Sequence, residues 1–197
     1  MKRFCLIFML AFSFLLPITA LADQPKFKLA ILPYVAPTNG DIQAAVNAIG
    51  PVKKEAYIES FQTGIENKFA ERFNSNNYEL VPPNQIKAAL SKYGYDVSTL
   101  DFPDKNDFIS IANELNVDGV VGLEITQFKI TYGLIRINIT YRLRSFNVKT
   151  NNYSSLLINY TSDEFRVSPL NSDKAIRERL TKNVSLALDE GLSKLSF

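Results

Sequence analysis

Apolar and polar residues alternate through the second half of the chain. Between Ile135 and Arg144 the odd-numbered residues are apolar and the even-numbered residues are polar. This period of two predicts a β-strand with one buried and one solvated face. The flanking segments 117–130 and 153–165 are also rich in strand-forming residues, and short turns separate them from the central segment 134–148. We therefore expect three long strands in an antiparallel meander.

The lengths of the two turns predict which side chains share a face. A three-residue turn at 131–133 pairs odd positions with odd positions, and an even-length turn at 149–152 pairs odd positions with even ones. The predicted core face then carries Val121, Leu123, Ile125, Ile137, Ile139, Tyr141, Leu143, Leu156, Ile158 and Tyr160. The predicted solvated face carries Glu124, Thr126, Arg136, Asn138, Thr140, Arg142, Arg144, Asn159 and Thr161.

Helical periodicity marks most of the remaining chain. Phe61, Ile65, Phe69 and Phe73 recur every four residues and predict a long helix over 52–73. Other helices are expected at 41–49 inside the loop 35–51, at 84–93 after a Pro-Pro pair, at 104–116 and at 173–195, with short strands at 28–34 and 78–81. The order β-α-β-α-α-β-β-β-α predicts an α/β fold, with α+β character in its second half. We expect a mixed sheet of about five strands with helices packed on it.

The first 22 residues have the features of a secretory signal peptide. Lys2 and Arg3 precede an apolar run over 4–16, and Ala20 and Ala22 frame a cleavage motif. A retained membrane anchor is the alternative, but this run is shorter than the roughly 20 apolar residues that a span needs. We therefore expect cleavage after residue 22, a single α/β domain over 23–197, and an exported protein that is periplasmic or associated with the outer membrane.

Cleavage would also change the composition of the chain. The segment holds the only Cys, both Met and two of the 22 basic residues, so 20 basic and 20 acidic residues remain, with no Cys, Met, His or Trp. Because Cys5 lies before the apolar run, it is not placed to become a lipid-bearing first residue, and we expect no lipoprotein. No later apolar window is long enough to span a membrane.

This composition narrows the chemistry. Without His or Cys there is no Ser-His or Cys-His pair and no zinc site of the usual ligands, and no glycine-rich phosphate loop follows the first strand. Asp101, Asp104 and Asp107 form one tight acidic cluster, which predicts a helix cap more strongly than a calcium site. A neutral chain gives little counterion release, so nucleic acid is not expected as a partner. We expect no catalysis, cofactor or metal.

Several motifs then indicate a family. The first strand KLAILPY, the segment YELVPPNQ and the run ANELNVDGVVGLEI over 112–125 occur in this order. In this respect the chain resembles the exported α/β envelope domain shared by the N-terminal part of TolB, LpoB and the curli secretion protein CsgG. The resemblance implies a non-enzymatic module that binds partner proteins, activates a peptidoglycan synthase or assembles into a secretion channel. LpoB and CsgG are lipoproteins, and this chain departs from them in that respect.

Two surfaces are candidates for partner binding. The first is the arginine row Arg136, Arg142 and Arg144 with Glu124 on the solvated face, because Arg is favoured at interfaces; an ordinary solvated face is the alternative. The second is the loop 35–51, with Pro37, Asn39 and Gly40. We expect an envelope interaction or assembly module that binds an envelope partner or itself. The alternatives are a periplasmic small-ligand binder with a crevice at 33–39 and, more distantly, a hydrolase with two buried acids facing one cleft.

Overall fold

The computed structural model describes residues 25–34, 54–95, 102–131, 136–164, 172–195 and 197. Within these ranges the elements follow the expected order. They are β1 (Phe27–Ile31), α3 (Lys54–Arg72), β2 (Tyr78–Leu80), α4 (Pro83–Lys92), α5 (Lys105–Leu115), β3 (Gly119–Thr131), β4 (Arg136–Asn147), β5 (Asn152–Thr161) and α6 (Ser172–Ser193). The predicted α/β class is confirmed. The helix expected at 41–49, the signal segment and the loop 35–51 lie outside the described residues.

The strands form one mixed sheet in the order β2-β1-β3-β4-β5. Strand β1 runs parallel to β2 and to β3, and β3, β4 and β5 form the expected antiparallel meander. Leu143 lies opposite Leu156, and Tyr141 lies opposite Ile158, as the alternation of apolar residues predicts. The buried side chains on β3, β4 and β5 therefore share one face.

The turn between β3 and β4 differs from the prediction. Thr131 pairs with Arg136, so the connection has four residues and an odd position faces an even one. A β-bulge at Thr126 then shifts the register, and Ile125 faces Tyr141, odd against odd. The face predicted for Val121, Leu123 and Ile125 is correct, but the bulge produces it and not a three-residue turn. Beyond the bulge the buried position moves to Phe128, whose ring packs edge-on against Phe61.

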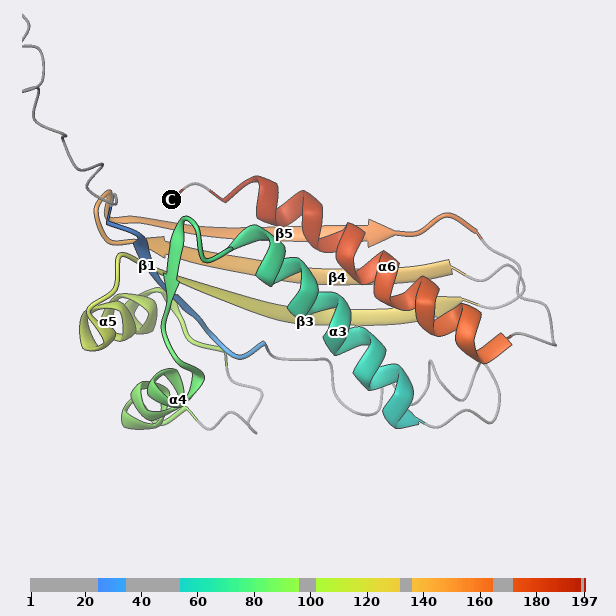
Figure 1. Ribbon diagram of the computed structural model, residues 1–197, viewed down its shortest axis with the longest axis horizontal. Helices are drawn as coiled ribbons and strands as arrows, with labels where there is room; N and C mark the ends of the chain where they lie inside the picture. Colours follow the sequence, from blue (N-terminus) through green and yellow to red (C-terminus); the bar gives the residue numbers. More distant parts are fainter. Residues whose placement is uncertain (1–24, 35–53, 96–101, 132–135, 165–171, 196) are drawn as a thin grey trace, which may run out of the picture.

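Helices α3 and α6 lie side by side across the long strands (Figure 1). They run parallel, because Thr181 Oγ1 donates to Ser60 O at one end (3.0 Å) and Arg72 Nη2 donates to Leu195 O at the other (3.3 Å). Gly64 lets the two backbones approach, since a Cβ there would lie 2.9 Å from Thr181 O. The predicted stripe on α6 is buried: Ile176, Leu180, Val184, Leu188, Leu192 and Leu195.

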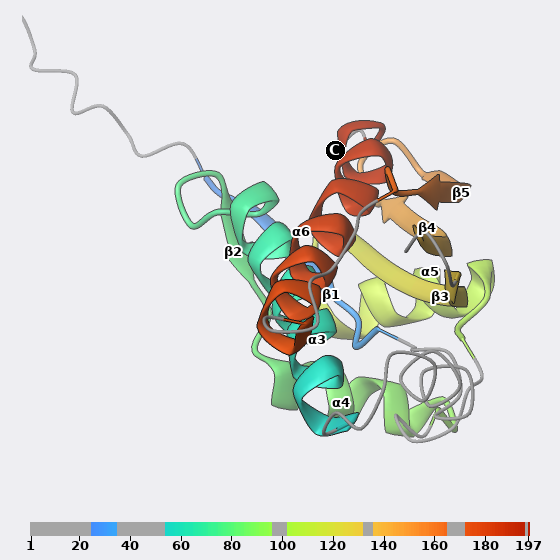
Figure 2. The ribbon, with the colours of Figure 1, turned by 90° about the vertical axis from the view of Figure 1, so that its right-hand side faces the viewer.

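The opposite face of the sheet is covered at one end. Helices α4 and α5 lie beside β1 and the start of β3 (Figures 1 and 2), and a second apolar cluster forms there around Phe108, Ile111 and Phe146. Towards the far ends of β3, β4 and β5 the helices of the described chain cover only the face that holds Tyr141. The described helices therefore cover one face of the sheet along its length and the other face at one end only.

The stretch from α5 into β3 forms a tight turn. Asn116 ends α5 in the left-handed conformation, with a φ of 47°. Two residues later the Asp118 carboxylate accepts the Lys28 backbone N–H at 2.8 Å, and the Asp118 N–H donates to Lys28 O at 2.8 Å. This double contact aligns β3 with β1 at the start of their parallel pairing. The NVDG motif thus works as a helix end and strand start, as its sequence predicts.

Candidate functional site

The part of the sheet that no described helix covers is the candidate site, and we call it the open face. It is the side of β3, β4 and β5 opposite α3 and α6, beyond the contacts of α4 and α5. Its side chains are exposed or half-buried and are Glu124, Thr126, Gln127, Lys129, Arg136, Asn138, Thr140, Arg142, Arg144, Ser155, Leu157, Asn159 and Thr161. All but Gln127, Lys129, Ser155 and Leu157 were predicted to lie on a solvated face, and the bulge at Thr126 brings the first two there.

Glu124 lies between two of the predicted arginines. Its Oε2 atom accepts a hydrogen bond from Arg142 Nη1 at 3.3 Å and another from Arg144 Nη2 at 3.1 Å. Cross-strand pairing places Glu124 directly opposite Arg142. One carboxylate is therefore shared between two guanidinium groups, and Arg144 also interacts with the charge of Asp104.

The two arginines have different environments. Arg144 is only 13% exposed, its Nη1 atom donates to Pro103 O at 2.7 Å, and its guanidinium lies 4.7 Å from the centre of the Phe102 ring. Arg142 is 36% exposed and donates one of the five N–H groups of a guanidinium to Glu124. Arg144 therefore anchors the segment before α5, and Arg142 is the arginine of this pair that faces outward.

Arg136 does not join this cluster. It begins β4 and forms an ion pair with Glu164 beyond the end of β5. It lies six positions before Arg142, which is about 20 Å along a strand. The predicted arginine row is therefore divided into a cluster near α5 and a separate ion pair at the far end of the sheet.

Between these two ends the open face is polar. Thr140 Oγ1 donates to Asn159 Oδ1 at 3.0 Å, and Thr161 Oγ1 donates to Asn138 Oδ1 at 3.0 Å. Leu157 is the exception, because it lies opposite Arg142 in the register and is 55% exposed. The pairing of Leu157 with Arg142 could not be predicted from either strand alone, although the even turn length implied it.

The acidic cluster acts as a helix cap. Asp104 Oδ1 accepts the backbone N–H groups of Asn106 (2.7 Å) and Asp107 (3.1 Å), and Asp107 Oδ2 accepts the Asp104 N–H at 2.9 Å. The hydrogen bond from Asp107 N–H, followed by the one from Asn106, lowers the pKa of Asp104, and the charge of Arg144 lowers it further. The predicted cap is confirmed; Asp101 lies outside the described residues.

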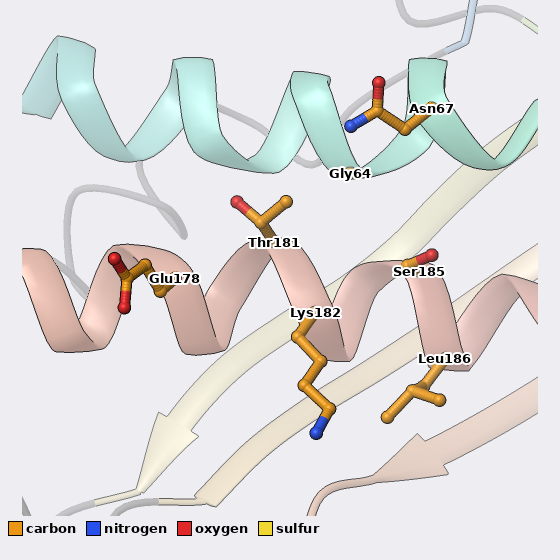
Figure 3. Close-up of a pocket in the computed structure, with 7 residues that line it drawn as sticks. All are labelled: Gly64, Asn67, Glu178, Thr181, Lys182, Ser185 and Leu186. Atoms are coloured by element: carbon orange, nitrogen blue, oxygen red, sulfur yellow. The ribbon is translucent and has the colours of Figure 1, made fainter.

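Two hollows lie elsewhere, along the outer side of α3 and α6. The larger, of about 430 Å³, is lined by Gly64, Asn67, Glu178, Thr181, Lys182, Ser185 and Leu186. Figure 3 shows these side chains spread along the two helices without converging on one point. The smaller, of about 300 Å³, contains Lys68, which contacts Glu71 and Asp189; the hydrogen bonds to Asp189 and then to Glu71 raise the pKa of Lys68.

These hollows do not correspond to the predicted ligand crevice. They lie between two helices, and the crevice was expected where β1 ends; of its residues only Pro33 and Tyr34 fall within the described chain. The hollows were missed because the sequence does not show that α3 and α6 are neighbours. Of the buried polar residues in the described ranges, none is Asp or Glu, so the described chain does not hold the buried acid pair that carboxylate hydrolysis would need.

The remaining sequence-predicted sites cannot be placed. Pro37, Asn39 and Gly40 and the cleavage residues Ala20 and Ala22 lie outside the described residues. Within the part of the chain that is described, no helix combines the length and the hydropathy needed to cross a membrane. No group of three or more acidic, His or Cys side chains is positioned there to hold a metal ion.

Comparison with known proteins finds likeness in structure. No protein-family model matches the sequence, and no curated protein matches it significantly. The hypothetical protein CT253 from Chlamydia trachomatis is 14% identical with a TM-score of 0.43, over 85% of this chain and 98% of that one. Lipoprotein GNA1162 from Neisseria meningitidis is 11% identical with a TM-score of 0.39, over 83% and 99%.

The C-terminal domain of LpoB from Salmonella enterica is also similar. It is 15% identical with a TM-score of 0.37, over 71% of this chain and 87% of that chain. The structures similar to this chain thus include LpoB, which its sequence motifs resemble, together with a lipoprotein and a hypothetical protein. At these values each is a distant likeness.

Proposed function

We propose that this chain is an exported, non-catalytic protein of the cell envelope that acts as a protein–protein interaction or assembly module. The observation that carries the proposal is the open face, where outward-facing Arg142 lies beside Leu157, which is 55% exposed. Arg is one of the residue types that most often dominate binding energy at interfaces, and Leu157 adds exposed apolar surface beside it. Because no described helix covers this pair, a partner can reach it without a rearrangement of the described elements.

The charge of the cluster indicates the chemistry of the partner. Glu124 is shared between Arg142 and Arg144, so the charge of Arg142 is only partly neutralised and can attract a partner carboxylate. The planar guanidinium can hold such a carboxylate through two parallel hydrogen bonds. A partner with an acidic residue next to an apolar one therefore fits this part of the open face.

Charge reversal at Arg142 tests this function. The full chain with an affinity tag is expressed in its native host, proteins of the envelope are crosslinked in the cell, and captured partners are quantified by mass spectrometry. We expect Arg142→Glu to lower partner capture by about tenfold or more, because it places a second carboxylate beside Glu124 and repels an acidic partner.

The matched control is Lys149→Glu, which makes the same change in net charge at an exposed turn residue between β4 and β5. Capture by this variant should equal that of the unmodified chain. A further variant, Arg136→Glu, measures whether the partner extends to the far end of the sheet. Undiminished capture by Arg142→Glu, with its thermal midpoint unchanged, would show that the open face is not the binding surface.

A further inference from the structure

The outer edge of β5 suggests a particular partner. We propose that two copies of this chain pair antiparallel through β5, joining their two sheets into one. This inference rests on the proposed function of an interaction module and names a second copy as one partner. It concerns the edge of the sheet, whereas the proposed function concerns the open face, so the two can fail separately.

Strand β5 lacks the usual protections of a sheet edge. It is the last strand in the sheet order, and no described residue pairs with its outer side. It pairs with β4 over ten consecutive residues without a register shift. Its sequence NYSSLLINYT contains no charged residue and no proline. Folded monomers commonly block a long edge with charges, proline or a bulge, and the opposite edge, β2, has only three residues.

The hydrogen-bond pattern shows which residues offer their backbone to a partner. Just beyond β5, Ser162 N–H donates to Ile137 O at 2.9 Å. Because antiparallel strands alternate in this respect, the even-numbered residues of β5 bond to β4, and the odd-numbered residues direct N–H and C=O outward. These outward residues are Tyr153, Ser155, Leu157, Asn159 and Thr161.

This pattern determines how a second copy would align. Directly opposite residues in an antiparallel pair must both offer their backbone groups, so odd positions must face odd positions. The register that uses all five outward residues has a two-fold axis at Leu157, the middle one. It places Leu157 against Leu157 of the second copy, Ser155 against Asn159, and Tyr153 against Thr161.

The side chains agree with this register. On the open face the apolar residue meets an apolar residue, and its polar neighbours meet polar ones. On the core face Leu156 would lie opposite Ile158 of the second copy, so the apolar face of one sheet would continue into the other. Helix α6 packs on this same face, where Tyr160 Oη donates to Asn183 Oδ1 at 2.7 Å. Because β5 has no charged side chain, it cannot form ion pairs with a charged strand. A second copy of β5 in this register, in contrast, matches its apolar and polar positions.

Disulfide crosslinking tests the register. The chain contains one cysteine, Cys5, so the variants are made with Cys5→Ser and expressed as the full chain in the envelope. Leu157→Cys should form a covalent dimer under mild oxidation, because facing Cα atoms in such a pair are about 5.5 Å apart and within the range of a disulfide. Ser155→Cys is the matched control; its two copies would be about 13 Å apart along the strand and should not crosslink.

Molar mass in solution is the second measurement. The purified chain should have twice its monomer mass by light scattering, and Leu157→Lys should reduce the mass to that of the monomer. Leu186→Lys makes the same change at another exposed leucine, on α6, and should leave the dimer intact. A monomeric unmodified chain, or equal crosslinking of both cysteine variants, would overturn the proposal.

The remaining outcomes separate the two hypotheses. If Leu157→Cys crosslinks to a different protein, the edge of β5 binds that protein and the proposed pairing of two copies is wrong. If Arg142→Glu abolishes capture while Leu157→Cys gives no dimer, the interaction function stands and the self-pairing is wrong. If the dimer forms but Arg142→Glu captures partners normally, the edge binds and the open face does not.

Discussion

Tyr141 connects the sheet to α6 through a single buried hydroxyl. Its Oη atom donates to Ala187 O at 2.6 Å and accepts the Gly191 N–H at 3.1 Å, so the hydroxyl lies between residues one helical turn apart. The side chain is fully buried, and burial raises its pKa above the ordinary value. Removing the hydroxyl would leave polar backbone groups of α6 facing an apolar interior.

A substitution at Gly191 should reveal how closely the two elements fit. A Cβ there would lie 2.6 Å from Tyr141 Oη, so we expect Gly191→Ala to destabilise the fold by about 1–3 kcal/mol in spite of alanine's higher helix propensity. The free energy of unfolding in urea measures this effect. In a Tyr141→Phe background the clashing atom is absent, and the added cost of Gly191→Ala should be smaller. Additive effects would contradict this account.

The arginines show what a residue pattern leaves open. Arg142 and Arg144 occupy equivalent positions in the alternation of β4, and the sequence treats them alike. The structure buries Arg144 against Phe102 and Pro103 and leaves Arg142 facing outward. The difference comes from the segment before α5, because Arg144 contacts Pro103, which lies 41 positions earlier in the sequence. Periodicity within one strand contains no information on that contact.

At the scale of elements, the first turn of α5 is the clearest example of local determination. The Asp-x-x-Asp spacing of Asp104 and Asp107 satisfies backbone N–H groups at the helix start in both directions. Tyr95 Oη contacts Asp107 as well, and burial, followed by this hydrogen bond, raises the pKa of Tyr95 to about 12. The cap therefore begins α5 and also connects it to the chain after α4.

The cap should make stability depend on pH. Because the pKa of Asp104 is lowered from 3.8 in the fold, its ionised form stabilises the folded state at neutral pH, and this contribution is lost as the pH falls through the folded pKa. We expect Asp104→Asn, which keeps a capping oxygen, to reduce the fall in thermal midpoint between about pH 5 and pH 3. Asp104→Ala should lower the midpoint at neutral pH.

Asp163→Asn is the control for this experiment, since Asp163 is an exposed acid outside any helix. It should leave the profile of the unmodified chain nearly unchanged over the same pH range. Identical profiles for Asp104→Asn and the unmodified chain would show that the cap charge does not contribute to the pH dependence.

The meander shows the limit of element-scale reasoning. Alternation predicts which residues of a strand face the core, but the bulge at Thr126 reverses it. Before the bulge odd-numbered residues of β3 face the core, and after it even-numbered residues do. The predicted face of Leu123 and Ile125 is correct although the predicted turn is one residue too short, because the bulge compensates for the difference. Phe128 could have indicated the bulge from sequence alone. A large apolar residue at this even position would be exposed in an unbroken strand that buries its odd positions.

At the scale of the whole molecule, signal cleavage would determine whether the functional protein is the full-length or the processed chain. If the signal is cleaved where Ala20 and Ala22 indicate, intact-mass spectrometry of the protein from the envelope should find a chain that begins at Asp23. Replacing Ala22 with arginine should block processing, because the cleavage site requires small residues, and should leave the longer form in the cell. A precursor of full mass in the unmodified protein would instead indicate a retained anchor.

The sequence by itself determined the order of elements, the mixed sheet, the buried stripe of α6 and the cap of α5. Each of these depends on contacts between near neighbours or on a repeating apolar period, and both are readable along one segment. Only the tertiary structure decided that α3 and α6 run side by side, that Arg144 anchors a loop while Arg142 faces outward, and that β5 forms the edge of the sheet. These features depend on which distant segments meet, and no local pattern encodes that choice.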